Sequence, residues 1–166
     1  MKPSEVDSDA ILKEVLSDVG KLRLPWPKQP AGDDPTFDFP PDPALLNILE
    51  LAGLMGRLMG WFGYNTQMLA RLESELVLVD AEYRLKVNAA GIAARKELGR
   101  VSAEVIESAV LAENEEITPL YQRRLKLLSL KPQFDRRGIM YEKLHSALSR
   151  EQSRREMEAQ LARGGE

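Results

Sequence analysis

The sequence lacks cysteine, contains one histidine, and has few aromatic residues. Without thiols, neither a disulfide framework nor a thiolate metal site is possible. With one histidine in 166 residues, most nucleophile–base pairs of hydrolytic and transfer enzymes are also excluded. We therefore expect a protein that is not an enzyme and needs no cofactor.

The sequence also has no convincing metal or phosphate motif. Glu142 and His145 have the Glu-x-x-His spacing of carboxylate-bridged di-iron bundles, but such sites need a second pair and two further glutamates. The glycines at 53, 56, 60 and 63 have helical spacing and lack the strand–loop–helix context of a phosphate-binding loop. We expect no metal site.

Long apolar runs are absent as well. Residues 51–64 are apolar except for Arg57, and this run is shorter than the roughly 18 residues that a membrane-spanning helix needs. Interfacial membrane contact is the weaker alternative to burial against protein. The first ten residues carry acids where a signal peptide has a basic start followed by an apolar run, so we expect a cytoplasmic protein.

What the sequence does contain is a long apolar seam with a period of 3.5 residues. Such a seam is typical of a coiled coil. It runs through Ala44, Ile48, Leu51, Met55, Leu58, Phe62, Asn65, Leu69, Leu72, Leu76, Val79, Tyr83, Lys86, Ala90 and Ala93. The corresponding helix would be roughly 75 Å long at 1.5 Å per residue. We expect an all-α protein, a long helical hairpin with a kinked second arm, that assembles into a homo-oligomer with the form of a ring. Its oligomerisation residues would be Met55, Leu58, Phe62, Leu69, Leu72 and Leu76.

Three regions follow from the pattern. Residues 1–20 predict an amphipathic helix over 4–20, capped by Ser4 or Ser8 and ended by Gly20. It could dock on its own chain or bind a partner. Residues 21–43 hold seven prolines and predict an extended linker, with an acidic-aromatic docking peptide as the alternative. Residues 44–166 would form the hairpin.

Local signals predict where the hairpin helices begin and end. Asp42 and Pro43 predict the start of the long helix, and a glycine face with 3-4-3 spacing predicts close approach of another helix, or a break near Gly60–Gly63. Gly99 and Ser102 predict the turn into a next helix from about Ala103. That helix would break at Thr118-Pro119 and restart, end at Lys131-Pro132, and be followed by a turn or helix start at Gly138 and a last helix over about 139–162 that frays after Arg150.

Charge is distributed unevenly along the chain. Residues 1–50 carry five basic and ten acidic side chains, whereas residues 119–166 carry eleven basic and six acidic ones. Basic side chains with interleaved aromatics suit single-stranded nucleic acid, because cations neutralise phosphates and rings stack on bases. The candidate DNA-binding residues are Arg84, Lys86, Arg95, Lys96, Tyr121, Arg123, Arg124, Lys126, Lys131, Phe134, Arg136, Arg137, Tyr141 and Lys143. The competing interpretation is a structural adaptor whose acidic head and basic tail pair between copies.

The order of these elements resembles the UvsY-type recombination mediators of tailed phages. The similar stretches are Ile11–Asp18, Asp42–Trp61, Arg71–Glu73, Tyr83–Gly91, Val110–Glu113 and Arg137-Gly138, each of them short. The resemblance implies an all-helical ring that binds single-stranded DNA and helps a recombinase displace a single-strand-binding protein, with basic residues of the long helix at Arg84 and Lys86. The proline-rich insert, the glycine face and the longer last helix depart from the family pattern.

Overall fold

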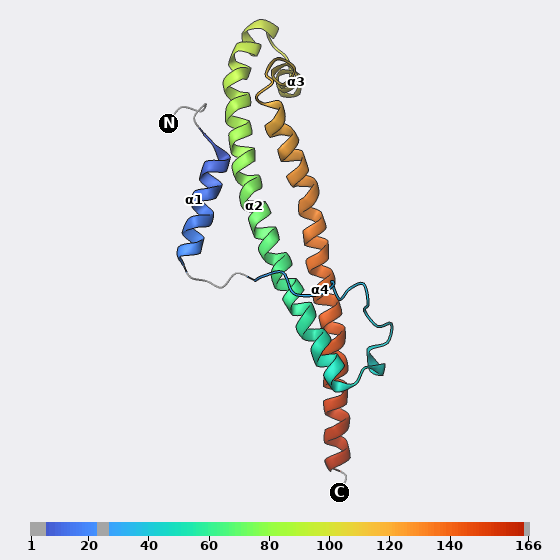
Figure 1. The fold of residues 1–166 in the computed structure, drawn as a ribbon. Coiled ribbons are helices and arrows are strands. Elements are labelled where there is room, and N and C mark those ends of the chain that lie inside the picture. Colours follow the sequence, from blue (N-terminus) through green and yellow to red (C-terminus); the bar gives the residue numbers. More distant parts are fainter. Residues whose placement is uncertain (1–5, 23–26, 165–166) are drawn as a thin grey trace. The chain divides into compact units, whose positions relative to one another are not determined.

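The computed structural model describes residues 6–22 and 27–164, and all regular structure in these ranges is helical (Figure 1). The elements are α1 (Ser8–Lys21), the short 3₁₀ helix η2 (Pro43–Leu45), α2 (Ile48–Leu98), α3 (Ala103–Glu113) and α4 (Thr118–Gly164). The predicted all-α class is therefore confirmed. The predicted cap at Ser4 lies outside the described residues.

The chain divides into two compact units, each of which contains part of α2 and part of α4. Unit 1 comprises residues 1–25 and 70–132, and unit 2 comprises residues 26–69 and 133–166. Helices α2 and α4 each pass from one unit into the other without interruption.

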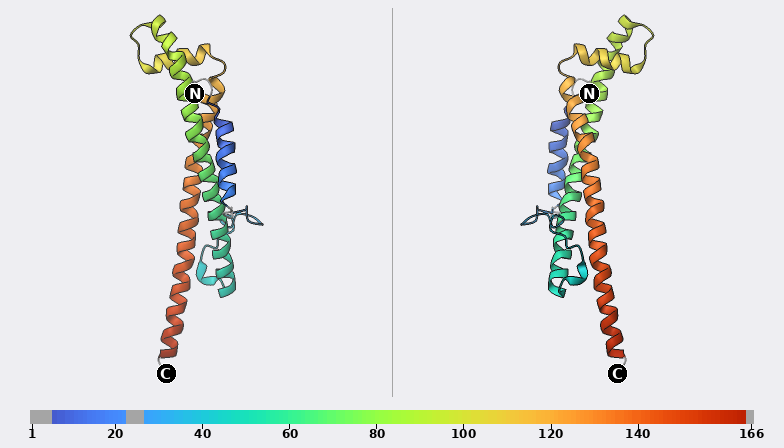
Figure 2. Two further views of the ribbon diagram at one scale, coloured as in Figure 1. Left: turned by 90° about the vertical axis from the view of Figure 1, so that its left-hand side faces the viewer. Right: turned by 90° about the vertical axis from the view of Figure 1, so that its right-hand side faces the viewer.

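In unit 1, α1 docks on the chain's own helices, which was one of the two alternatives. Asp7 caps the helix by accepting the backbone N–H groups of residues 9 and 10, so the cap expected at Ser8 was wrong by one residue. The Ser8 N–H instead donates to the Glu82 carboxylate at 2.9 Å, and Leu12 is buried. Figure 2 shows α1 alongside α2, and Arg123 of α4 lies 2.7 Å from Asp9 of α1. A 14-residue helix is marginal alone in water, so these contacts hold it in place.

In unit 2, the proline-rich segment packs against the helices instead of serving as a free linker. Asp34 and Pro35 are buried, and Phe39 packs against the hydrophobic core of the unit. A Cβ atom added to Gly60 would lie 3.4 Å from the Pro30 ring. Part of the glycine face therefore accommodates this segment of chain where we expected another helix.

Helix α2 begins at Ile48, later than predicted. Asp42 and Pro43 start the short η2 helix, in which the Asp42 carboxylate accepts the N–H of Ala44 at 2.9 Å. The cap of α2 is Asn47, whose side chain accepts the N–H groups of residues 49 and 50. The Glu50 carboxylate accepts the Asn47 N–H in return, which completes a reciprocal capping box. The possible break near Gly60–Gly63 does not occur.

The seam of α2 is covered largely within the chain. In unit 2, Leu51, Leu54 and Leu58 form a core with Tyr141 and Leu148 of α4, and Met55 and Phe62 pack against it. Leu72 is also buried, while Leu69 and Leu76 are half-buried. In unit 2, α4 supplies a partner surface for the seam, while assembly of this helix with other copies stays a prediction.

In unit 1, the turn between α2 and α3 forms as predicted. Gly99 has a φ of +73°, which favours glycine, and its N–H bonds the Arg95 carbonyl as α2 ends. The Ser102 hydroxyl accepts the Val105 N–H and caps α3. Ile106 and Val110 then pack on Tyr83 and Ala94 of α2, which forms the core of this unit.

Helix α4 starts at Thr118 as expected but does not stop at Pro132 or turn at Gly138. A proline inside a helix removes one N–H donor and usually ends or kinks the helix. Around Gly138, tertiary contact outweighs local propensity, because the Asn65 side-chain amide donates to the Phe134 carbonyl at 3.0 Å. A Cβ at Gly138 would lie 3.3 Å from that amide nitrogen, so glycine permits the close approach of α2 and α4 in unit 2.

Candidate nucleic-acid interface

Two arginines of α4 in unit 1 form ion pairs with acidic side chains of the same unit. Arg123 lies 2.7 Å from Asp9 of α1 and 2.7 Å from Glu75 of α2. Arg124 lies 2.6 Å from Asp80 and stacks over the ring of Tyr83, with its guanidinium carbon 5.5 Å from the ring centroid. These two arginines therefore tie α4 to the neighbouring helices.

Three further candidate residues in unit 1 also have acidic partners. Lys131 lies 2.6 Å from Glu73. On α2 itself, Lys86 lies 2.6 Å from Glu82, and Arg84 lies 2.8 Å from Asp80. Arg84 nevertheless keeps most of its side chain exposed, at 68%. Solvent screens the exposed Arg84 side of this pair, so a phosphate can compete for Arg84, although Asp80 is half-buried and also binds Arg124.

The contacts between α1 and the rest of unit 1 shift the pKa values of the charged groups that take part in them. The hydrogen bond from Arg123 is the main reason that the pKa of Asp9 is lowered, and that bond also raises the pKa of Arg123. Burial alone would raise the pKa of Glu82, but its bonds to Lys86 and Ser8 outweigh burial and lower that pKa. Both carboxylates are therefore charged at neutral pH. Asp9 neutralises part of the charge of the basic segment of α4 (residues 121–143), and Glu82 neutralises Lys86 of α2.

The spacing of charged residues along the sequence could have predicted these ion pairs, but it was overlooked. The acids Glu73 and Asp80 are seven residues apart, and so are Arg124 and Lys131. In two antiparallel helices these spacings match, so that 73 meets 131 and 80 meets 124, as the structure shows. The acidic head likewise meets the basic segment within one chain, through Asp9 and Arg123.

The three candidate aromatic residues are less accessible than expected. Tyr141 is only 1% exposed, and its hydroxyl donates to Asp34, so its ring offers no stacking face. Its assignment to base stacking was wrong, because Tyr141 belongs to the core of unit 2. Phe134 is half-buried. Tyr121 is half-buried in unit 1 and packs on Tyr83 with ring centroids 5.6 Å apart.

One pocket of unit 1 gathers arginines from α2 and α4. It has a volume of about 280 Å³ and is bounded by Arg84, Arg95 and Arg124, with Asn88 between them and Glu107 on the α3 side. Arg95 is exposed and forms no ion pair with any described residue. The Glu107 carboxylate accepts the Tyr83 hydroxyl and so already has a donor. The pocket thus presents an excess of positive charge and an amide, a donor set that suits a phosphate group.

The other exposed candidate residues lie outside this pocket. Lys96 and Lys126 are exposed in unit 1. In unit 2, Arg136 and Lys143 are exposed, and Arg137 lies 4.0 Å from Asp34. The predicted site residues are therefore distributed over both units, and the structure joins three of them around one pocket.

No family model matches this chain, and no curated protein or solved structure shows a significant match to it. Over the described ranges, no helix has a stretch long and apolar enough to cross a membrane. Among the same residues, no group of three or more potential metal ligands comes together.

Proposed function

We propose that this chain binds the backbone of single-stranded DNA and acts as a recombination mediator. The observation that carries the binding proposal is the convergence of Arg84, Arg95 and Arg124 on one pocket of unit 1. The role in recombinase loading, displacement of a single-strand-binding protein and ring assembly rests on the resemblance to UvsY-type mediators.

The pocket and the residues beside it reduce the candidate DNA-binding residues to a few side chains. Arg95 supplies a cation without an acidic partner among the described residues, and Arg84 supplies one that is itself largely exposed, although it pairs with the half-buried Asp80. Lys96 lies one residue from Arg95 on α2, and Lys126 lies two residues beyond Arg124 on α4. DNA phosphates would bind these side chains, while Arg123 would hold α1.

A second candidate function, a helical adaptor without nucleic acid, is favoured by the ion pairs themselves. Arg123, Arg124, Lys86 and Lys131 all have acidic partners within unit 1, and the whole chain carries a net charge of −3. Under this alternative, the basic segment exists to assemble the helices and has no affinity for phosphate.

Fluorescence anisotropy with a labelled oligonucleotide at several salt concentrations separates the two functions. Binding to single strands should weaken by about 0.7 log unit per log unit of salt for each neutralised phosphate. Arg84→Ala combined with Arg95→Ala should reduce that slope by about 1–2 units. Arg71→Ala, an exposed arginine on α2 that does not line the pocket, is the matched control. Absence of binding at low salt would favour the adaptor.

A further inference from the structure

The first turns of α2, in unit 2, expose an apolar face that no described part of the chain covers. Leu45 is 81% exposed, Ile48 70%, Leu49 80% and Met59 48%. Ala52, Gly53 and Gly56 lie on the same side of the helix and are exposed too. An exposed contiguous apolar surface of this kind marks an interaction site.

Apart from Ile48, which also belongs to the apolar seam, this face is distinct from the side of α2 that packs inside the chain. Leu51, Leu54 and Leu58 point into the core of unit 2, whereas the exposed face lies on the other side of α2. At Gly53 and Gly56 the space is open, since nothing lies within 4 Å of where a Cβ would be. The face therefore has a shallow middle flanked by larger apolar side chains, a shape into which another helix can pack.

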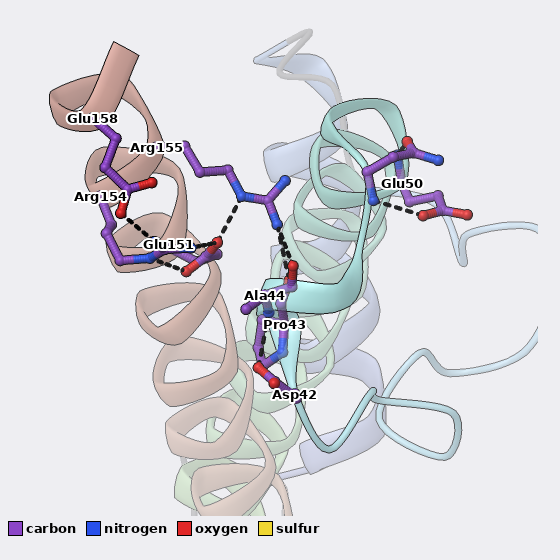
Figure 3. Close-up of polar contacts among 9 residues, drawn as sticks. Asp42, Pro43, Ala44, Glu50, Glu151, Arg154, Arg155 and Glu158 are labelled. Atoms are coloured by element: carbon purple, nitrogen blue, oxygen red, sulfur yellow. Dashed lines mark hydrogen bonds and ion pairs between the residues drawn. The ribbon is translucent and has the colours of Figure 1, made fainter. Parts of the chain in front are cut away.

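Local contacts fix the start of this face. Arg155 of α4 donates to the carbonyls of Pro43 and Ala44, at 3.3 and 3.0 Å, and so holds the η2 turn that carries Leu45 (Figure 3). Arg155 also binds Glu151 at 2.6 Å, and Arg154 binds the same carboxylate. Beyond η2, the Asn47–Glu50 capping box fixes the first turn of α2. The apolar side chains are thus presented on ordered backbone.

We propose that this face pairs with the same face of a second copy of the chain, with the two α2 helices antiparallel. Charge complementarity identifies this partner. Glu50 and Arg57 lie on one edge of the face, and within the described residues Arg57 forms no ion pair. The midpoint of positions 50 and 57 falls between residues 53 and 54, which is also the midpoint of 48 and 59.

A two-fold axis through that midpoint makes the face complementary to itself. Such an axis places the same edge of both helices together, so Glu50 of each copy faces Arg57 of the other. It also brings Ile48 of each copy opposite Met59 of the other, and it places the crossing point beside Gly53. A parallel two-fold pair would instead place the Glu50–Arg57 edges of the two copies on opposite sides of the interface, where these charges could not pair. The pairing needs no nucleic acid and stands independently of the proposed function.

The first test is the mass of the full chain in solution, by sedimentation or light scattering over a range of micromolar concentrations. The wild-type chain should dimerise. Leu49→Arg should yield a monomer with unchanged helix content, because Leu49 lies outside the core, whereas Val77→Arg, at another exposed apolar position of α2, should still dimerise. A monomeric wild-type chain, or a Leu49→Arg variant with the wild-type mass, would overturn the proposal.

A second variant shows whether a loss of dimerisation is due to the interface and not to misfolding of the chain. Gly53→Leu meets open space within the chain and replaces glycine by a better helix former, so the single chain should be at least as stable as before. In the pair, the new side chains meet at the crossing point and should weaken dimerisation roughly a hundredfold. Unchanged dimerisation of this variant would contradict the antiparallel crossing.

The register is tested by mixing two charge variants. Glu50→Lys alone and Arg57→Glu alone should each dimerise about tenfold more weakly, because each copy then faces like charge at both edge positions. An equal mixture should restore dimerisation, since every lysine or arginine of one chain meets a glutamate of the other. Failure of the mixture to exceed either variant would refute the proposed register.

Discussion

The hydroxyl of Tyr141 donates a hydrogen bond to the carboxylate of Asp34 at 2.5 Å, although 107 residues separate them. Both residues are buried in unit 2. Asp34 also accepts the Thr36 N–H at 3.0 Å, and Arg137 lies at 4.0 Å. Burial would raise the pKa of Asp34, but these donors outweigh it and lower that pKa. The proline-rich segment is thereby attached to α4 through a buried carboxylate.

Removing the donor should weaken that attachment. Tyr141→Phe leaves a buried carboxylate with one donor fewer, and a hydrogen bond to a charged group contributes about 1.5–3 kcal/mol. We expect a comparable loss in the free energy of unfolding, measured by urea denaturation. Tyr64→Phe is the control, because the Tyr64 hydroxyl forms no hydrogen bond with the described residues. Equal stability of the two variants would contradict this account.

The tyrosines also predict a loss of stability at high pH. Burial, followed by a hydrogen bond to a carboxylate, raises the pKa of Tyr83 beside Glu107 and of Tyr141 beside Asp34. An unfolded tyrosine ionises near pH 10, so above that pH only the unfolded state gains from ionisation. The stability that these groups contribute is complete below about pH 10 and is lost above it.

The measurement is the free energy of unfolding as a function of pH. Above about pH 10 it should fall by roughly 1.4 kcal/mol per pH unit for each of the two tyrosines. Tyr83→Phe should remove one of the two contributions to this slope. A flat profile between neutral pH and pH 11 would show that these hydroxyls are not held in their neutral form.

The helical class and the helix boundaries around the α2–α3 turn and at Thr118 could be predicted because they depend on local chemistry. Periodic apolar residues, the Ser102 cap and the left-handed Gly99 act over one or two turns, and the structure confirms each of them. Asp42 shows the limit of such signals, because it caps a helix as expected, yet only the short η2, while Asn47 caps α2.

The predictions that were wrong concern residues whose structure depends on contacts with segments far away in the chain. Pro132 and Gly138 look like helix ends locally, but α4 continues through both. The basic segment looked available for phosphate because its acidic partners Asp9, Glu73 and Glu75 lie 48 to 114 residues away. Burial of Tyr141 depends on Asp34 in a segment that composition alone describes as a linker.

Gly138 provides a direct test of this long-range effect. Alanine there should gain about 1 kcal/mol in helix propensity, yet its Cβ would crowd the Asn65 amide, which is buried and bound to Phe134. We expect Gly138→Ala to lower the free energy of unfolding by about 1 kcal/mol, since a weakened buried hydrogen bond exceeds the gain. Gly20→Ala in α1 is the control and should be neutral or stabilising, because nothing lies near its Cβ position. A stabilised Gly138→Ala variant would show that the Asn65 side chain can move away from the new Cβ without a net loss of stability.

The last prediction concerns whether α1 limits the charge available to DNA. Arg123 is shared between Asp9 and Glu75, and its pairing with Asp9 is exposed on the α1 side, where the Asp9 side chain is 70% exposed. Asp9→Asn should leave the fold intact, because Asp7, and not Asp9, caps α1. It should release part of the Arg123 charge, and binding to single-stranded DNA should strengthen by a few-fold at low salt.

Asp18→Asn is the matched control for that variant. It makes the same change of net charge on the same helix, but Asp18 pairs with Lys21 of α1 instead of α4. If long-range attraction alone strengthened binding, both variants would bind DNA equally well, because each gains one unit of positive charge. A larger effect of Asp9→Asn, lost again when Arg123→Ala is added, would assign the gain to Arg123. Equal effects would show that Arg123 stays bound to Glu75 and that α1 does not control access to the basic segment.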